Sequence, residues 1–345
     1  MRTAMGVHSR GTGLGQFLAV GVLILLAAMW LAMAIGDVPV HPTTVLDVLA
    51  NRLLGAGIAL DPIEEGIVWH YRLSRAVVAA CGGAILALCG VVLQALLRNP
   101  LAEPYLLGIS AGASTGAAAV LVLGIGSFTF GLAGGAFMGA TLAFLFVAVL
   151  AGKAGGGSER IILAGIAGSQ LFNAATTFII TSSANAEQTR GVMFWLLGSL
   201  GGVRWMDAAF AFPAVALGMA LCLFRARALD AFTFGETAAT TMGVDIRRIR
   251  IELFGLAALL TASVVSVVGA IGFVGLVIPH AVRLVLGGRH MRLIPATALT
   301  GAVFLVMADV LARIIIPGQV LPIGVVTALF GAPIFAAMLW NTRRH

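Results

Sequence analysis

Long uncharged runs separated by short polar connections make up most of the chain. The first run covers residues 14–36, and its 23 residues are enough, at about 1.5 Å per residue, to cross a hydrocarbon core of about 30 Å. Nine more runs of similar character follow it. The pattern therefore predicts ten transmembrane helices, at residues 14–36, 76–97, 105–125, 128–152, 161–183, 208–224, 253–271, 272–286, 293–314 and 320–340.

Two details of this pattern leave alternatives open. Arg2 and Arg10 precede the first run and residues 32–34 (AMA) imitate a cleavage site, as in a signal peptide. An apolar signal core has only about 7–15 residues, however, which favours an uncleaved span. The runs at 253–271 and 272–286 are nearly continuous and are divided by glycines rather than charges, so a single span is the alternative there.

The composition agrees with a membrane protein. Hydrophobic residues make up 60% of the 345 residues and charged residues 10%, and the mean hydropathy is +1.05. Soluble domains have about 45–50% apolar and about 25% charged residues. These values exclude a soluble enzyme and a DNA-binding domain. We therefore predict an all-α polytopic membrane protein in which residues 1–345 form a single transmembrane domain.

The excess of positive charge is explained by topology. The chain has 21 basic and 14 acidic residues, a net charge of +7. With the amino terminus inside, fifteen Lys and Arg residues fall on the cytoplasmic side, as the positive-inside rule requires. Both termini are then cytoplasmic, and no nucleic-acid partner is needed to explain the charge. Six arginines remain outside, namely Arg52, Arg72, Arg75, Arg190, Arg204 and Arg313.

Three polar connections are long enough to carry function. Residues 37–75 and 184–207 are predicted on the outer face, and the second should contain an amphipathic element at the mouth. Residues 225–252 are predicted on the cytoplasmic face.

Catalytic and metal-binding signatures are missing from the sequence. Lys153 is the one lysine, and it does not stand in a phosphate-binding G-x-x-x-x-G-K-[ST] loop, so ATP hydrolysis would have to come from a partner. H-E-x-x-H is absent too. The cysteines lack C-x-x-C spacing and lie in apolar runs, where we interpret them as small buried residues; they are Cys81, Cys89 and Cys222.

Some polar residues inside the spans have two readings. Residues 108–112 match the G-x-S-x-G elbow of hydrolases around Ser110, but they open an apolar helix of small residues, which favours helix packing. His280 follows Pro279, and a hydrogen bond to a freed carbonyl is favoured over a role as ligand or proton relay. Asp309 and Arg313 are four residues apart on one helix, so we expect them to pair.

Several stretches, read in order, resemble the FecCD-type permease family, the membrane subunits of bacterial ABC importers for iron–siderophores, haem and cobalamin. The resemblance extends from about residue 20 to residue 340. It is carried by residues 72–75 (RLSR), 99–104 (NPLAEP), 107–113 (LGISAGA), 194–200 (FWLLGSL), 269–280 (GAIGFVGLVIPH), 308–313 (ADVLAR) and 321–327 (LPIGVVT).

The resemblance implies a bundle like that of the cobalamin-importer permease, in the bacterial inner membrane. It also implies a dimer, most simply a homodimer, with a path along the two-fold axis, two cytoplasmic ATPase subunits that bind ATP and Mg, and an extracytoplasmic substrate-binding protein. The chain itself would hold no metal and no cofactor. The cargo would be a metal chelate. An Fe(III)–siderophore is the first expectation, and haem and cobalamin are the alternatives.

Family roles can be carried to matching positions. A short amphipathic helix in residues 225–252 should couple the chain to the ATPase. The alternative is a solvated basic loop that only fixes the orientation of the chain in the membrane. The coupling residues would be Gly235, Glu236, Ala238, Ala239, Met242 and Gly243. On the outer face, Arg72, Arg75 and Arg313 would receive acidic side chains of the binding protein. Snorkelling to headgroups is the alternative for Arg75, and Asp309 competes for Arg313.

The resemblance implies a path lined by the third, fifth and tenth spans, with candidate residues on the third and fifth. The candidates are Ser110, Ser114, Gln170, Asn173, Thr176 and Thr177. Hydrogen bonding between neighbouring helices is the alternative role for them. The rival to an importer subunit is a self-sufficient secondary transporter driven by an ion gradient, although such a carrier would be expected to bury more carboxylates. A haem cargo would favour His70 or Met193 near the mouth.

Overall fold

The computed structural model describes residues 13–36, 38–127, 131–155, 157–243 and 245–342. Within them, seven helices are long and apolar enough to cross a membrane, and three shorter apolar helices join them. Each of the ten predicted apolar runs is therefore matched by a helix; residues 128–130, at the start of the fourth run, lie outside the described residues. These helices are α1 (Leu14–Ala34), α4 (Ser74–Leu96), α5 (Ile109–Leu123), α6 (Gly131–Lys153), α7 (Ser158–Ser183), α9 (Trp205–Phe224), α12 (Ile246–Val268), α13 (Val274–Leu286), α14 (His290–Ile314) and α15 (Ile323–Thr342).

The remaining helical segments lie in the long connections. On the predicted outer side they are α2 (Pro42–Leu54), α3 (Pro62–Gly66) and α8 (Ala186–Leu196). The predicted amphipathic element at the mouth is α8, which begins with a capping box between Asn185 and Gln188. The π-helical η1 (Ile67–Leu73) precedes α4, the short 3₁₀ helix η2 (Pro104–Leu107) precedes α5, and the predicted cytoplasmic side carries α10 (Ala226–Thr233) and α11 (Glu236–Thr241).

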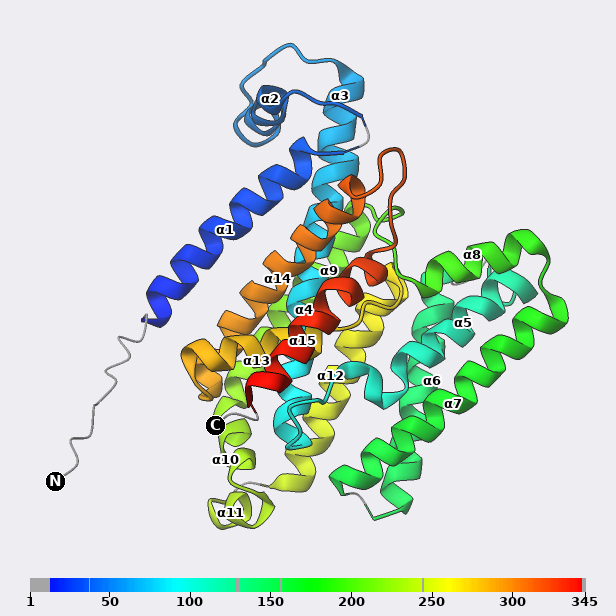
Figure 1. Cartoon of the computed structure of the whole chain (residues 1–345), viewed down its shortest axis with the longest axis vertical. Coiled ribbons are helices and arrows are strands. Elements are labelled where there is room, and N and C mark those ends of the chain that lie inside the picture. Colours follow the sequence, from blue (N-terminus) through cyan, green and yellow to red (C-terminus); the bar gives the residue numbers. More distant parts are fainter. Residues whose placement is uncertain (1–12, 37, 128–130, 156, 244, 343–345) are drawn as a thin grey trace.

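Helix α4 is the centre of the bundle. It runs through a group formed by α9, α12, α13 and α14, and α1 covers the outer side of α14 (Figure 1). Glycines allow the closest approaches: a Cβ on Gly83 would overlap the Gly301 carbonyl oxygen, and one on Gly90 would overlap that of Gly275. The hydrophobic effect does not drive helices together within lipid. Small residues instead allow the helix backbones to approach closely, so that van der Waals packing stabilises their association.

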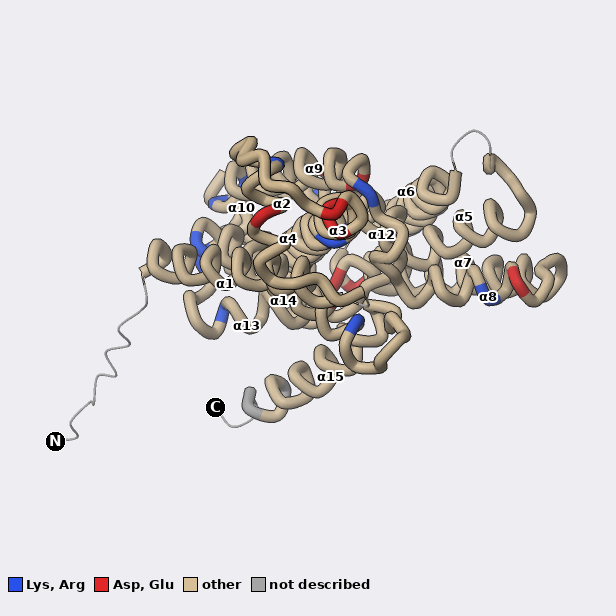
Figure 2. Tube along the Cα trace, turned by 90° about the horizontal axis from the view of Figure 1, so that it is seen from above, with Lys and Arg blue, Asp and Glu red and all other residues tan. Residues whose placement is uncertain are grey.

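A second group of helices, α5 to α8, stands beside the first (Figure 1). Gly112 and Gly116 of α5 meet Gly139 and Gly135 of α6 without room for a Cβ, and α12 packs against both helices. Seen from above, most of the chain is uncharged, and charged residues are confined to short stretches that include α2 and α3 (Figure 2). Such a distribution is expected of a bundle whose flanks face lipid.

The break between α12 and α13 is real, so the two-span interpretation of residues 253–286 is confirmed. Residues 269–273 are not helical, and both Gly269 (φ 74°) and Phe273 (φ 70°) have left-handed backbone conformations. The end of α8 and the loop after it lie against this break, because a Cβ on Gly269 would overlap the Trp195 carbonyl oxygen and the Gly198 backbone. Glycine is required at position 269 for both reasons.

The second span begins earlier than the sequence predicts. Helical structure is continuous from Pro62 to Leu96, a stretch of 35 residues, and includes η1. The predicted boundary at residue 76 was wrong because Arg72 and Arg75 were taken as residues of an outer connection, whereas both lie inside the helix.

Candidate functional site

The predicted coupling segment, residues 225–252, forms two short helices and the first turn of α12. Gly235 (φ 102°) turns the chain between α10 and α11, and Gly243 (φ 79°) follows α11 and ends it, as predicted. Ala239 is fully buried, so α11 has an inner face. Phe234 and Met242 are 72% and 61% exposed, which leaves an apolar surface at both ends of α11.

Ion pairs and hydrogen bonds fasten the coupling segment to the bundle. The Asp230 carboxylate of α10 accepts the backbone N–H of His290 at 2.9 Å and lies 2.7 Å from the His290 Nδ1 atom. The Glu252 carboxylate of α12 binds Arg225 at 2.6 Å and Arg248 at 2.9 Å. Asp230 thus links α10 to α14, and Glu252 links α12 to Arg225, the residue that precedes α10.

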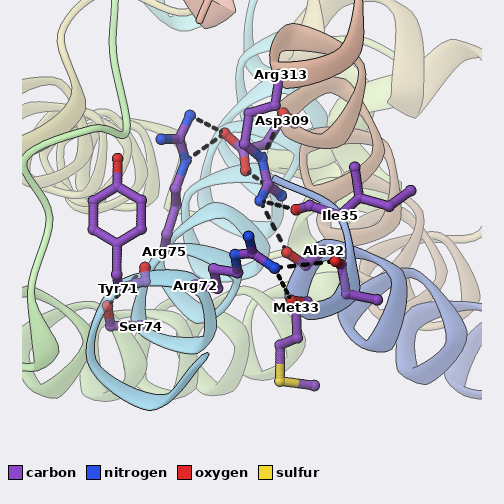
Figure 3. Close-up of polar contacts among 10 residues, drawn as sticks. Ala32, Met33, Ile35, Tyr71, Arg72, Ser74, Arg75, Asp309 and Arg313 are labelled. Atoms are coloured by element: carbon purple, nitrogen blue, oxygen red, sulfur yellow. Dashed lines mark hydrogen bonds and ion pairs between the residues drawn. The ribbon is translucent and has the colours of Figure 1, made fainter. Parts of the chain in front are cut away.

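On the opposite side of the bundle, four charged residues form the outer arginine cluster: Arg72, Arg75, Asp309 and Arg313 (Figure 3). Asp309 Oδ1 accepts hydrogen bonds from Arg75 Nε and lies 2.8 Å from Arg75 Nη2. Asp309 Oδ2 lies 3.1 Å from Arg313 Nη2, so the predicted pair of Asp309 and Arg313 is confirmed. One carboxylate thus serves two guanidinium groups.

The other donors of the cluster bind the carboxyl end of α1. Arg72 Nη1 donates to the carbonyl oxygens of Met33 at 2.8 Å and Ala34 at 3.0 Å. Arg313 Nη1 donates to those of Ala32 at 2.9 Å and Ile35 at 2.7 Å. The last carbonyls of a helix lack intrahelical donors and carry its negative dipole end, so cations are stabilised there.

The side chains of the three outer arginines are buried in the single chain. Arg72, Arg75 and Arg313 are 2%, 2% and 5% exposed. Their guanidinium groups turn inward because α1 offers carbonyl oxygens and Asp309 offers a carboxylate within the bundle. The docking of a binding protein at Arg72, Arg75 and Arg313 stays a prediction.

The predicted path residues divide into two groups. Gln170, Asn173 and Thr177 share one face of α7 and are exposed on the isolated chain. Thr176 and Ser114 are buried: Thr176 Oγ1 lies 2.9 Å from Thr115 Oγ1, and Ser114 Oγ donates to the Ser110 carbonyl. Thr176 therefore joins α7 to α5, whereas the Ser114 hydrogen bond stays within α5.

Sequence reasoning missed the role of Gln94. Pro279 inside α13 has no N–H for the carbonyl of Gly275, and Gln94 Nε2 donates to that oxygen at 3.3 Å and to that of Leu276 at 3.2 Å. Gln94 Oε1 in turn accepts from Arg283 Nη1 at 3.1 Å. Pro279 could have indicated this role from the sequence, because a proline within a helix leaves the carbonyl four residues earlier without its backbone donor.

Among the described residues, ten apolar helices with short helices at one end and a buried ionic cluster at the other define a multi-pass membrane protein. The chain belongs to the FecCD transport family, whose sequence profile matches residues 24–341. It is 43% identical to the cobalamin import system permease protein BtuC of Halobacterium salinarum, over 79% of this chain and 73% of the relative. It is 38% identical to the Fe(3+) dicitrate transport system permease protein FecD of Escherichia coli K12, over 80% of this chain and 86% of the relative.

Solved structures agree with this assignment. A metal-chelate type ABC transporter in an inward-facing conformation superposes with a TM-score of 0.83 at 29% identity, covering 95% of this chain and 99% of that chain. PsaBC from Streptococcus pneumoniae in complex with Fab gives a TM-score of 0.54 at 20% identity, covering 79% of this chain and 92% of that chain, and shows the fold alone. The predicted family and fold class are confirmed.

Proposed function

We propose that the chain is the membrane subunit of a binding-protein-dependent ABC importer that moves a metal chelate by alternating access. The observation that carries the proposal is the superposition of nearly the whole chain on an inward-facing metal-chelate type ABC transporter. In this mechanism ATP closes two partner ATPases, the coupling segment moves with them, and helices on either side of a path between two copies of the chain rearrange.

Coupling is assigned to the exposed apolar surface of α10 and α11. Met242→Glu places a charge on that surface, and because Met242 is 61% exposed the change leaves the fold intact. Lys153→Glu is the control, since Lys153 is also exposed on the predicted cytoplasmic side but is the last residue of α6, outside the coupling segment. Reconstituted with ATPase and binding protein, the Met242→Glu variant should lose uptake at least tenfold while the control keeps it; equal uptake by both would contradict the assignment.

The path is assigned to the exposed polar face of α7. A stripe with Gln170, Asn173 and Thr177 is unfavourable against lipid and suits a water-filled passage or a second copy of the chain. Asn173→Phe should block uptake because it fills that face, whereas Leu171→Phe, at an exposed position on another face of the same helix, should not. A dimer that transports normally with Asn173→Phe would place the path elsewhere.

Two chelates are the leading candidates for the cargo. The ferric siderophore predicted from sequence remains one. The relative with 43% identity carries a cobalamin name and the relative with 38% identity a ferric dicitrate name, so cobalamin is tested first. Proteoliposomes with the cognate binding protein and ATPase, given labelled cobalamin, ferric siderophore and haem in parallel, separate these cargos. Uptake of none of them would refute the metal-chelate assignment.

The ion pairs of Asp309 with Arg75 and Arg313 argue against the secondary-transporter alternative. A proton-coupled carrier needs a carboxylate that can gain and lose a proton within the membrane, and among the described residues Asp309 is the fully buried acid. Both of its oxygens are already engaged in ion pairs, Oδ1 with Arg75 and Oδ2 with Arg313. Accumulation of the cargo by the chain alone, without ATP, would nevertheless restore that alternative.

A further inference from the structure

A cavity of about 710 Å³ opens at the predicted cytoplasmic end of the bundle, beside the coupling segment. It lies between the end of α4, α10, the end of α13 and the start of α14, and we call it the cytoplasmic basic cavity. Its lining residues include Arg98, Asp230, Arg283, Arg289 and His290. Neither the path nor the outer arginine cluster shares any of these residues.

The charge in this cavity is unbalanced. Three guanidinium groups line it, from Arg98, Arg283 and Arg289, and among the described residues none of the three has a carboxylate within ion-pair distance. Asp230 is the one acidic residue on the wall, and its Oδ1 is already bound by His290. An anion is therefore the ligand that the cavity lacks.

Two further observations point to a built site. Arg98 ends α4 with φ 50°, a left-handed conformation that strains a non-glycine residue, and this places an arginine where helices usually end in glycine. The His290 side chain is about 2% exposed, and its Nε2 atom is buried without a hydrogen-bond partner in the described structure. Both residues line the same cavity, so its wall holds a strained arginine and a buried imidazole nitrogen without a partner beside the unbalanced charge.

The surroundings of the cavity identify the source of the anion. Next to Arg283 and Arg289, the apolar side chains of Leu284, Val285 and Met291 are 70%, 59% and 48% exposed. Guanidinium groups beside an exposed apolar surface, at the cytoplasmic end of membrane helices, match the two halves of a phospholipid. A free phosphate would use the arginines but would leave the apolar surface uncovered.

We propose that the cytoplasmic basic cavity binds the phosphate of an anionic phospholipid from the inner leaflet, with acyl chains along Leu284, Val285 and Met291. Arginine is suited to this ligand because its planar fork binds two phosphate oxygens together. Since α10 forms one wall, a bound lipid would brace the coupling segment against α13 and α14. The inference goes beyond the proposed transport function and holds whatever chelate is carried.

The test uses the full chain, purified in detergent, with native mass spectrometry to count retained lipid. Phosphatidylglycerol should bind at least tenfold more tightly than phosphatidylcholine. Arg98→Gln and Arg289→Gln should each weaken phosphatidylglycerol binding at least fivefold, and both positions are exposed, so the fold survives. Arg292→Gln is the matched control, because Arg292 is exposed in the same turn as His290 but does not line the cavity. It should change binding less than twofold.

Three results would overturn the proposal. The first is equal phosphatidylglycerol binding by wild type, Arg98→Gln and Arg289→Gln. The second is displacement of the lipid by inorganic phosphate at similar concentrations, which would identify free phosphate as the ligand. The third is a result in which Arg98→Gln and Arg289→Gln bind phosphatidylglycerol as wild type does but no longer retain the ATPase subunit when the complex is purified. That result would mean that an acidic side chain of the ATPase fills the cavity.

Discussion

Asp309→Asn tests whether the outer arginine cluster stabilises the bundle. The substitution keeps the shape of the side chain and removes its charge. Arg313 retains the carbonyls of Ala32 and Ile35, so the loss falls mainly on Arg75, which is 2% exposed and whose Nη1 atom already lacks a partner. A buried charge left without its partner costs about 3–5 kcal/mol, and hydrogen bonds between membrane helices tend towards lower values.

We therefore expect Asp309→Asn to destabilise the chain by about 3 kcal/mol. At about 2 °C per kcal/mol for a chain of this size, the apparent Tm in detergent at a fixed scan rate should fall by about 6 °C. Glu187→Gln is the control: Glu187 is exposed on α8, and its change should alter Tm by less than about 1 °C.

A double-mutant cycle separates the ionic interaction from general disruption. Arg75→Gln combined with Asp309→Asn leaves no unpaired charge at that contact, so the double variant should be less destabilised than the sum of the single variants by more than about 1 kcal/mol. Strictly additive effects, or a Tm for Asp309→Asn equal to that of the control, would refute the reasoning.

The other predictions concern packing and hydrogen bonding. Gly90→Ala should lower the apparent Tm by several degrees because its Cβ would overlap the Gly275 carbonyl, whereas Gly255→Ala, with open space around its Cβ, should be neutral or stabilising. Gln94→Leu should cost about 1–3 kcal/mol in unfolding measurements, since it leaves the Gly275 carbonyl without its donor; Asn99→Ala, in the exposed turn after α4, should cost less. Trp205→Phe should cost about 1 kcal/mol by losing the bond to the Trp69 carbonyl, with unchanged stability arguing against that bond.

The spans could be predicted from sequence because lipid allows few alternatives. Any segment that crosses the hydrocarbon must satisfy its backbone internally, so length and hydropathy identify α1 or α6 without knowledge of its neighbours. The break before α13 was also readable, since Gly269 takes a backbone conformation that favours glycine. The end of α11 at Gly243 follows from the same property.

The positions of the arginines could not be predicted in the same way. Arg72 and Arg313 bind carbonyls of α1 that are 39 and 281 residues away along the chain. A charge pattern reports which side of the membrane a residue is on, but not whether its side chain turns towards water or towards a helix end. The π-helical turn that contains Arg72 has no recognised sequence signature either.

Helix α14 is fastened at both of its ends. His290 joins it to α10 at one end, Asp309 joins it to α4 near the other, and Gly301 is locked against Gly83 between them. At about 1.5 Å per residue its 25 residues extend about 37 Å. A force applied at the cytoplasmic surface would therefore move α14 and α4 together as one unit. The opening and closing of a passage would then depend on the helices that move relative to this pair.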